Sequence, residues 1–179
     1  MSSGRLLGIC GSLRAGSLNR KLMMEAKAAF DPKSFEEGNL RLPLYDGDLE
    51  AAEGIPEAIQ LLSDQIAAAD AVVISGPEYN KSISGALKNA LDWVSRTEGN
   101  PWKGKPVALM SATAGRSGGE RGQLMMRESL VAFQPRLLPG PEVLVGAAKD
   151  QFDGDKLTNP INRKALEGLM AALREAAGL

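Results

Sequence analysis

The sequence predicts an α/β fold in which a parallel sheet lies between two layers of helices. Short apolar segments alternate with longer segments whose apolar residues recur every three or four positions. Alternation of this kind is typical of doubly wound parallel sheets. Unusual loops follow the first, third and fourth predicted strands, at the carboxyl ends where ligands bind in such folds. We expect five strands and five helices, forming a single domain over residues 1–179.

The predicted strands are short and apolar enough to lie inside a covered sheet. Residues 5–10 and 70–75 are almost continuously apolar, as strands buried on both faces are. Residues 35–42 carry a weaker pattern. Pro139 and Pro141 should bend or shorten the fifth strand, because proline lacks the N–H that a sheet needs. The predicted strands are residues 5–10, 35–42, 70–75, 105–110 and 137–145.

Each predicted helix has one apolar face. The second helix shows this most clearly, because Ile59, Leu62 and Ile66 follow one another at spacings of three and four, with Pro56 near its first position. Residues 43–48, just before it, are rich in turn formers and are predicted to be a loop. The predicted helices are residues 20–30, 56–69, 84–95, 120–133 and 160–177.

The composition excludes several classes of function. The chain has 179 residues, 44% of them hydrophobic, and a net charge of −1, so it has no basic footprint for nucleic acid. No segment resembles a signal peptide or a membrane span. A single cysteine, Cys10, excludes an intrachain disulfide and fits a reducing, cytoplasmic location. We predict that Cys10 is buried and packs as a small hydrophobic residue. Histidine is absent, so we predict no metal site and expect a cofactor to carry any demanding chemistry.

The most informative stretch is Gly-Ser-Leu-Arg-Ala-Gly-Ser-Leu-Asn at residues 11–19, between the first strand and the first helix. Free N–H groups at a helix start bind anions, and hydroxyl, amide and guanidinium side chains add donors. The stretch lacks the lysine of a Walker A loop and the glycine spacing of a dinucleotide fingerprint. Two interpretations stay open: a cradle for the single phosphate of a mononucleotide, or an ordinary turn with Ser17 or Asn19 as N-cap.

Two further loops follow the third and fourth strands. Pro-Glu-Tyr-Asn at residues 77–80 offers an aromatic ring, an amide and backbone donors for a flat heterocycle. The alternative is a proline-capped turn with a packed tyrosine. The small residues at 111–119 would let a ring approach the backbone closely, unless this is a flexible surface loop. Lys88 and Asp92, four residues apart, are expected to form a surface ion pair.

These motifs, together with Gly-Ala-Leu-Lys-Asn-Ala-Leu-Asp-Trp at residues 85–93, resemble the NADPH-dependent FMN reductase family, over about residues 5–146. The similarity is greatest to bacterial quinone and chromate reductases and related azoreductases. It implies a flavodoxin-like three-layer sandwich, strand order 2-1-3-4-5, with helices on both faces. It also implies noncovalent FMN, NADPH or NADH as hydride donor, and a homodimer or homotetramer.

The resemblance also implies the site. Residues of the first loop would hold the FMN phosphate, and residues of the other two loops would line the isoalloxazine ring. The match of the third loop is weaker, and the C-terminal third diverges. The implied phosphate residues are Ser12, Arg14, Ser17, Leu18 and Asn19, and the implied ring residues are Pro77, Glu78, Tyr79, Asn80, Ser111 and Gly115.

The implied reaction is hydride transfer from NAD(P)H to N5 of bound FMN and then to a quinone, with chromate, azo compounds and free flavin as other acceptors. No protein side chain is expected to act as a catalytic acid or base. Two alternative functions would bind the same flavin: a non-enzymatic electron carrier of the flavodoxin type and a redox sensor. Carriers of that type are usually strongly acidic, for docking to partners, and a net charge of −1 does not fit this well. A phosphoacceptor receiver domain is excluded, because Gly11-Ser12 and Gly76-Pro77 occupy the positions of its acidic residues.

Overall fold

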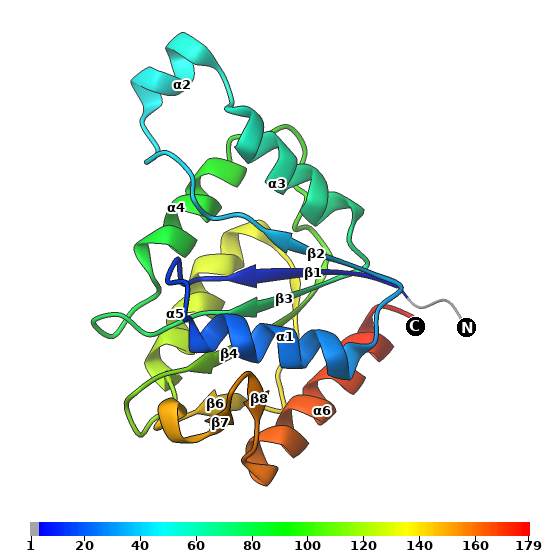
Figure 1. Cartoon of the computed structure of the whole chain (residues 1–179). Coiled ribbons are helices and arrows are strands. Elements are labelled where there is room, and N and C mark those ends of the chain that lie inside the picture. Colours follow the sequence, from blue (N-terminus) through cyan, green and yellow to red (C-terminus); the bar gives the residue numbers. More distant parts are fainter. Residues whose placement is uncertain (1–3) are drawn as a thin grey trace.

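The computed structural model describes residues 4–179, and its strands form the predicted parallel sheet (Figure 1). The strand order is β2-β1-β3-β4-β5, and a further strand, β6, also pairs with β4. Every pair in this sheet is parallel, so the carboxyl ends of the strands share one edge. The strands are β1 (Arg5–Cys10), β2 (Ser34–Gly38), β3 (Ala71–Ser75), β4 (Pro106–Ala112), β5 (Arg136–Leu137) and β6 (Val143–Val145).

Helices cover both faces of the sheet. Helices α1 and α6 pack on one face and α3, α4 and α5 on the other, as the two buried clusters and Figure 1 show. None of the helices in the described part of the chain is both long and apolar enough to cross a membrane. The helices are α1 (Leu18–Phe30), α2 (Gly47–Glu53), α3 (Glu57–Ala68), α4 (Gly85–Val94), α5 (Glu120–Leu130) and α6 (Pro160–Ala176).

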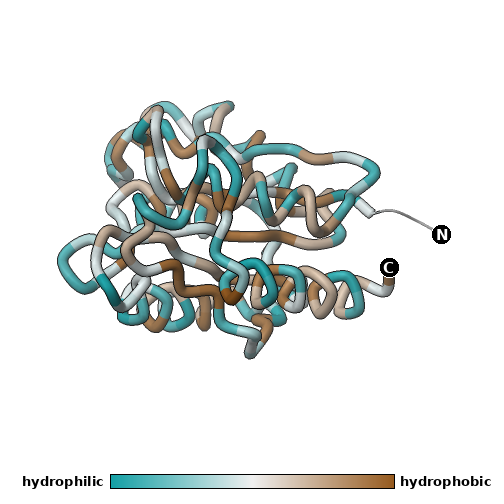
Figure 2. Tube along the Cα trace, turned by 60° about the horizontal axis from the view of Figure 1, so that its bottom comes forward, coloured by the Kyte–Doolittle hydropathy of each residue, from teal (hydrophilic) through white to brown (hydrophobic). Residues whose placement is uncertain are grey.

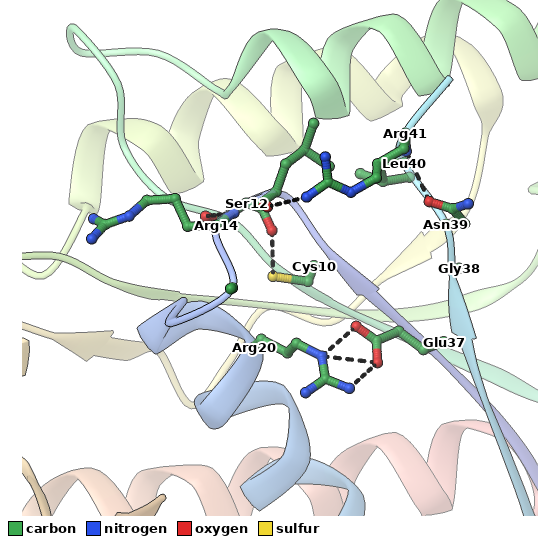
Figure 3. Close-up of a pocket in the computed structure, with 11 residues that line it drawn as sticks. Cys10, Ser12, Arg14, Arg20, Glu37, Gly38, Asn39, Leu40 and Arg41 are labelled. Atoms are coloured by element: carbon green, nitrogen blue, oxygen red, sulfur yellow. Dashed lines mark hydrogen bonds and ion pairs between the residues drawn. The ribbon is translucent and has the colours of Figure 1, made fainter. Parts of the chain in front are cut away.

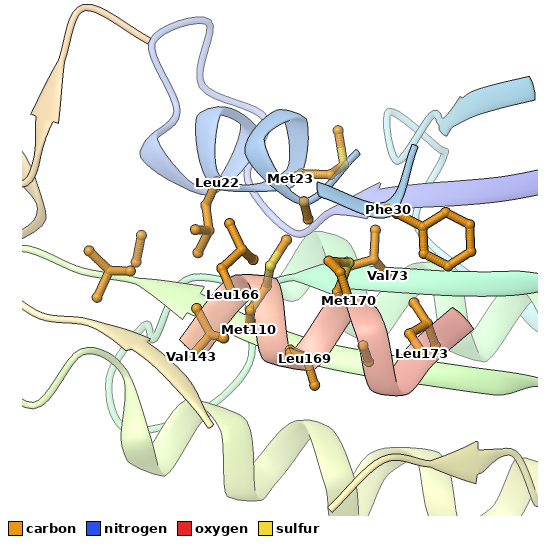
Figure 4. Close-up of a cluster of buried hydrophobic side chains, with 14 of the residues drawn as sticks. Leu22, Met23, Phe30, Val73, Met110, Val143, Leu166, Leu169, Met170 and Leu173 are labelled. Carbon is orange, nitrogen blue, oxygen red and sulfur yellow. The ribbon is translucent and has the colours of Figure 1, made fainter. Parts of the chain in front are cut away.

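The central strands are apolar throughout because each face buries alternate residues. In β3, Val73 packs in the cluster with α1 and α6, whereas Val72 and Ile74 pack in the cluster with α3, α4 and α5. Figure 4 shows the first cluster, in which Val73 and Met110 meet side chains of α1 and α6. The colouring of Figure 2 likewise places hydrophobic segments inside the fold. This arrangement confirms the interpretation of the continuous apolar runs.

The fifth predicted strand is divided. Residues 137–145 yield only the end of β5 and then β6, separated by a segment that contains Pro139 and Pro141. Both short strands still pair with β4. The second strand also ends early, at Gly38, and the chain then leaves the sheet. After β6 the chain forms a small antiparallel hairpin that the sequence analysis did not predict, β7 (Phe152–Asp153) and β8 (Lys156–Leu157).

Helix α2 was not predicted: its first two residues fall at the end of the predicted loop, residues 43–48, and the others follow that loop. None of its residues is buried, so it has no apolar face to signal it, and Figure 1 shows it projecting from the body. Contacts with α4 and the residues after it hold the segment in place. The rings of Tyr45 and Trp93 pack edge to face, with their centroids 5.0 Å apart. Arg96 Nε donates to both carboxylate oxygens of Glu50, at 3.0 and 3.1 Å. Hydrogen bonding from Arg96 lowers the pKa of Glu50.

Candidate functional site

The loop after β1 leads into the first turn of α1, where two backbone N–H groups are free. Ser17 is the N-cap of α1, and its Oγ accepts from Arg20 N at 3.3 Å. The backbone N–H groups of Leu18 and Asn19 donate to no other residue within 4–179. These free donors and the helix dipole favour an anion at this point. The N-cap interpretation is therefore correct, and it is compatible with the phosphate cradle, because the cap leaves two donors free.

Close packing holds this loop against the loop after β3. Gly11 N donates to Ser75 O at 2.9 Å, and Ser84 Oγ donates to Gly11 O at 2.5 Å. A Cβ at Gly11 would lie 3.1 Å from Pro77 Cδ and 3.2 Å from Gly76 Cα, so a side chain there would push the two loops apart. Glycine is therefore needed at position 11 because the backbones of the two loops pass so close to each other there.

Asn19 uses its side chain differently from the expectation. Its Nδ2 donates to Ala112 O at 2.8 Å, and its Oδ1 accepts from Ala112 N at 2.9 Å and from Ser75 Oγ at 3.1 Å. Only 4% of the residue is exposed. The amide therefore fastens the start of α1 to the ends of β3 and β4, and it is not free to bind a ligand. Only the backbone N–H of Asn19 remains available for a phosphate.

Arg14 is the free cation of the loop. Its side chain is exposed, and within the described chain its guanidinium makes no hydrogen bond or ion pair. Its backbone N–H donates to Ser12 Oγ at 3.4 Å, which shapes the turn. A guanidinium with all its donors available is well suited to phosphate oxygens.

The loop after β3 forms a tight hairpin. Tyr79 N donates to Ser82 O at 3.0 Å and Ser82 N to Tyr79 O at 3.1 Å, while Asn80 and Lys81 at the tip have φ of 51° and 68°. Asparagine tolerates this left-handed conformation, so the turn itself explains residue 80. Tyr79 is 46% exposed, which contradicts the alternative interpretation of a packed tyrosine. Glu78 Oε2 accepts from Gly122 N at 3.0 Å in the first turn of α5.

The loop after β4 is held at several points, which favours an ordered loop over the alternative of a flexible surface loop. Ser111 Oγ donates to Gly118 O at 2.5 Å and accepts from Gln123 Nε2 at 3.1 Å, and the residue has no exposed surface. Gly118 has φ of 65°, and a Cβ there would lie 2.5 Å from the carbonyl carbon of Leu144. Ser111 thus supports the loop from beneath.

The three loops enclose a cavity of about 420 Å³ at the carboxyl edge of β1, β3 and β4. It takes in every predicted site residue except Asn80, at the hairpin tip, and Ser111, beneath the loop. It also includes residues that the sequence analysis did not name. Lys149 gave no signal, because no motif surrounds it, whereas the others adjoin or lie inside the predicted loops. The cavity is lined by Ser12, Arg14, Ser17, Leu18, Asn19, Pro77, Glu78, Tyr79, Lys81, Ala112, Thr113, Ala114, Gly115, Ser117 and Lys149.

The electrostatics of the cavity favour a dianion. Arg14, Lys81 and Lys149 line it, against the single carboxylate of Glu78. That carboxylate is already engaged by the α5 backbone and lies 3.9 Å from Lys81 Nζ. The cavity is therefore positive overall, which attracts a phosphate group.

Cys10 lies beneath the first loop as a neutral thiol. It is 6% exposed, as predicted for a small buried hydrophobe, and its Sγ donates to Ser12 O at 3.4 Å. Burial raises the pKa of the thiol, which disfavours the thiolate, the nucleophilic form. The predicted ion pair of Lys88 and Asp92 is present at 2.6 Å on the surface of α4.

Fold and site together define a doubly wound α/β protein with a cavity, lined by three loops, at the carboxyl edge of β1, β3 and β4. The sequence profile of the NADPH-dependent FMN reductase family matches residues 5–150. The chain belongs to this family, as its loops indicated.

Comparisons with individual proteins support the assignment to this family. The chain is 40% identical over 173 residues to an NAD(P)H-dependent FMN reductase of Pseudomonas aeruginosa, covering 95% of this chain and 93% of that protein. It is 38% identical over 153 residues to a quinone reductase of Escherichia coli, covering 83% and 81%. Among solved structures, the flavoenzyme FerB of Paracoccus denitrificans, an NAD(P)H:(acceptor) oxidoreductase, superposes with a TM-score of 0.87 at 32% identity, covering 98% and 97%.

Proposed function

We propose that this protein is an FMN-dependent NAD(P)H oxidoreductase that reduces quinones or similar small acceptors. The observation that carries the proposal is the three-loop cavity, which combines free helix-start donors at one end with backbone and small side chains at the other. Relatives named as reductases favour an enzyme over an electron carrier or a redox sensor. Chromate, azo compounds and free flavin are further acceptors that the same assay can compare.

The residues present fit FMN. Leu18 and Asn19 would bind its phosphate through backbone N–H groups, Ser12 and Ser17 through hydroxyls, and Arg14 through its guanidinium. Residues 77–79 and 113–115 would line the ring, with Ser111 supporting the last loop from below. Bound FMN supplies a centre that accepts a hydride from NAD(P)H and passes it on. The protein's own groups bind, orient and exclude water, which agrees with the absence of histidine.

The proposal also covers the domain organisation, the cellular location and the hydride donor. Residues 4–179 would fold as one unit, since the two buried clusters share one sheet. The single cysteine suits a cytoplasmic location. NADPH and NADH are both donors in this proposal.

We expect excess FMN to raise the melting temperature of the protein. A ligand present at 100 times its Kd, bound only by the folded state, stabilises that state by about 2.7 kcal/mol. FAD should stabilise less, because the cradle suits a single terminal phosphate. The measurement is a thermal shift with FMN, FAD and no flavin. A colourless protein whose melting temperature does not change with FMN would contradict the proposed cofactor.

Steady-state kinetics should be ping-pong. One flavin cavity of about 420 Å³ would leave a single open ring face, so donor and acceptor must use it in turn. Double-reciprocal plots at several quinone concentrations should therefore be parallel. Lines that intersect would instead show that both substrates bind together, and a shared site would be ruled out.

The protein should assemble as a homodimer or homotetramer, with the cavity near a subunit boundary. Leu13 and Tyr79 support this proposal, since they are 40% and 46% exposed beside the cavity. Closed symmetry is the usual arrangement of homo-oligomers. Light scattering at micromolar concentration tests this, and a fully active monomer would refute it.

A further inference from the structure

A second cavity, of about 500 Å³, lies on the other side of the first loop (Figure 3). It is formed between the loop after β1 and the carboxyl end of β2, and we call it the β2-end cavity. Three arginines line it, Arg14, Arg20 and Arg41, against the single carboxylate of Glu37, so its formal charge is +2. The cavity therefore attracts negatively charged groups.

Arg41 is the arginine of this cavity that is best placed to bind a carboxylate. Arg20 is engaged by Glu37 through hydrogen bonds of 2.7–3.1 Å, and Arg14 is expected to bind the FMN phosphate. Arg41 Nη2 donates to Leu13 O at 2.7 Å, which holds the guanidinium at the cavity wall. Its Nε and Nη1 donate to no other residue in the described chain. Arg41 is thus anchored by one donor and presents the others.

The segment that follows the cavity carries the opposite charge. Residues 43–54, which include α2, contain four carboxylates and no lysine or arginine, and we call them the acidic arm. None of the residues of α2 is buried, and Figure 1 shows this helix projecting from the body. Within residues 4–179, the side chains of Asp48 and Glu53 form no hydrogen bond or ion pair. The arm therefore presents unpaired carboxylates on an exposed helix.

The acidic arm is fastened to α4 and the residues after it. Asn89 Nδ2 donates to Pro43 O at 2.8 Å, and Asn89 Oδ1 accepts from Tyr45 N at 2.9 Å. The ion pair of Glu50 with Arg96, at 3.0 Å, holds α2 itself. No residue of α2 lines the β2-end cavity. The negative arm and the positive cavity of one chain therefore stay apart, and both remain available to another molecule.

We propose that the acidic arm docks on the β2-end cavity of a second copy of this chain. A contact across a twofold axis is isologous, so each copy would supply one arm and one cavity, and the opposite charges would be matched twice. Leu44 of the arm is 80% exposed and Leu13 of the cavity wall is 40% exposed, so apolar surface accompanies the charges. This inference rests on the homo-oligomer of the proposed function and names its contact surfaces.

The contact would place the second copy beside the flavin. Ser12 and Arg14 line both the β2-end cavity and the FMN cavity, so an arm docked in one cavity stands next to the other. The FMN phosphate and the arm would not compete for one cation, because Arg14 would bind the phosphate and Arg41 the arm. The docked arm would thus form part of the border of the flavin site.

The test is sedimentation velocity of the FMN-loaded protein at micromolar concentration, with charge-reversed variants. One variant is Arg41→Glu, and the other, the arm variant, combines Asp48→Lys with Glu53→Lys. Repulsion would replace attraction at both equivalent contacts, which should raise the dissociation constant about a hundredfold, or about tenfold for each contact. We expect each variant alone to sediment with half the mass of the wild-type assembly.

A 1:1 mixture of the two variants should recover the wild-type mass. In the mixed assembly one contact pairs the native charges and the other pairs the reversed charges, so both are attractive. Arg163→Glu and Glu167→Lys each reverse one member of an exposed pair on α6, and these control variants should keep the wild-type mass. Recovery in the mixture would show that loss of assembly in the single variants does not come from misfolding.

A mixture that keeps the mass of the single variants would overturn the inference, as would single variants that assemble like the wild type. If Arg41→Glu does not fold, the salt dependence of the wild type decides. Its dissociation constant should rise between about 0.05 and 0.5 M NaCl, and a constant that does not change would overturn the inference. A monomeric wild type would overturn it together with the proposed homo-oligomer. FMN binding, measured by thermal shift, tests the proposed cofactor separately.

Discussion

Replacing Asn19 with alanine should lower the free energy of unfolding by about 3 kcal/mol. The substitution leaves three groups unpaired in a buried setting: the N–H and the carbonyl of Ala112 and the hydroxyl of Ser75. Each unpaired buried group costs about 1–3 kcal/mol, and water entering from the adjacent cavity offsets part of the sum. A loss of this size is a large fraction of the 5–15 kcal/mol that holds a typical domain together.

Urea unfolding of the FMN-free protein measures this effect, with Asn89→Ala as the matched control. Asn89 also bonds backbone through both ends of its amide, donating to Pro43 O at 2.8 Å and accepting from Tyr45 N at 2.9 Å. These bonds are exposed, so we expect a loss of only about 1 kcal/mol from the control. Equal losses for the two variants would mean that burial is not what makes Asn19 important.

The parts of the fold that the sequence predicted are those governed by local pattern. Strands β1, β3 and β4 are covered on both faces, so nearly every residue must be apolar, and such runs are visible in one dimension. Their loops could be assigned to one site because parallel strands end at one edge. The cavity therefore follows from topology and three short motifs.

Elements held mainly by distant contacts could not be predicted. Helix α2 has no buried residue, and the ion pair of Glu50 with Arg96 joins residues 46 positions apart. The division of the fifth strand depends on how much of it can reach β4 around its prolines, which the apolar pattern does not reveal.

Side-chain direction was the other limit. The sequence offered Asn19 as a ligand donor, but its partner Ala112 lies 93 positions away, and only the packed structure brings them together. Ser111 likewise serves the loop rather than the cavity wall. Residue type and loop position thus predicted which loops line the cavity, whereas the structure was needed to separate side chains that line it from side chains that support the loops.

Arg14 lines the cavity and is the residue that we expect to contact the FMN phosphate most strongly, so Arg14→Ala should weaken FMN binding about tenfold to thirtyfold. Its guanidinium makes no hydrogen bond or ion pair with the rest of the described chain, so its removal should leave stability unchanged. A charge-assisted hydrogen bond contributes about 1.5–3 kcal/mol, and the exposure of Arg14 places the effect toward the lower end. The measurement is FMN affinity by fluorescence quenching.

Ser17→Ala and riboflavin provide the controls. Ser17 would give phosphate a neutral contact of about 0.5–1.5 kcal/mol, so its loss should weaken FMN less than the loss of Arg14. Ser17→Ala should also lower stability by about 1 kcal/mol, because Ser17 Oγ caps α1. Riboflavin has the same ring but no phosphate, so neither variant should change its affinity. If both variants lost riboflavin and FMN affinity equally, the loop would not be recognising phosphate, and the assignment of the cradle would be wrong.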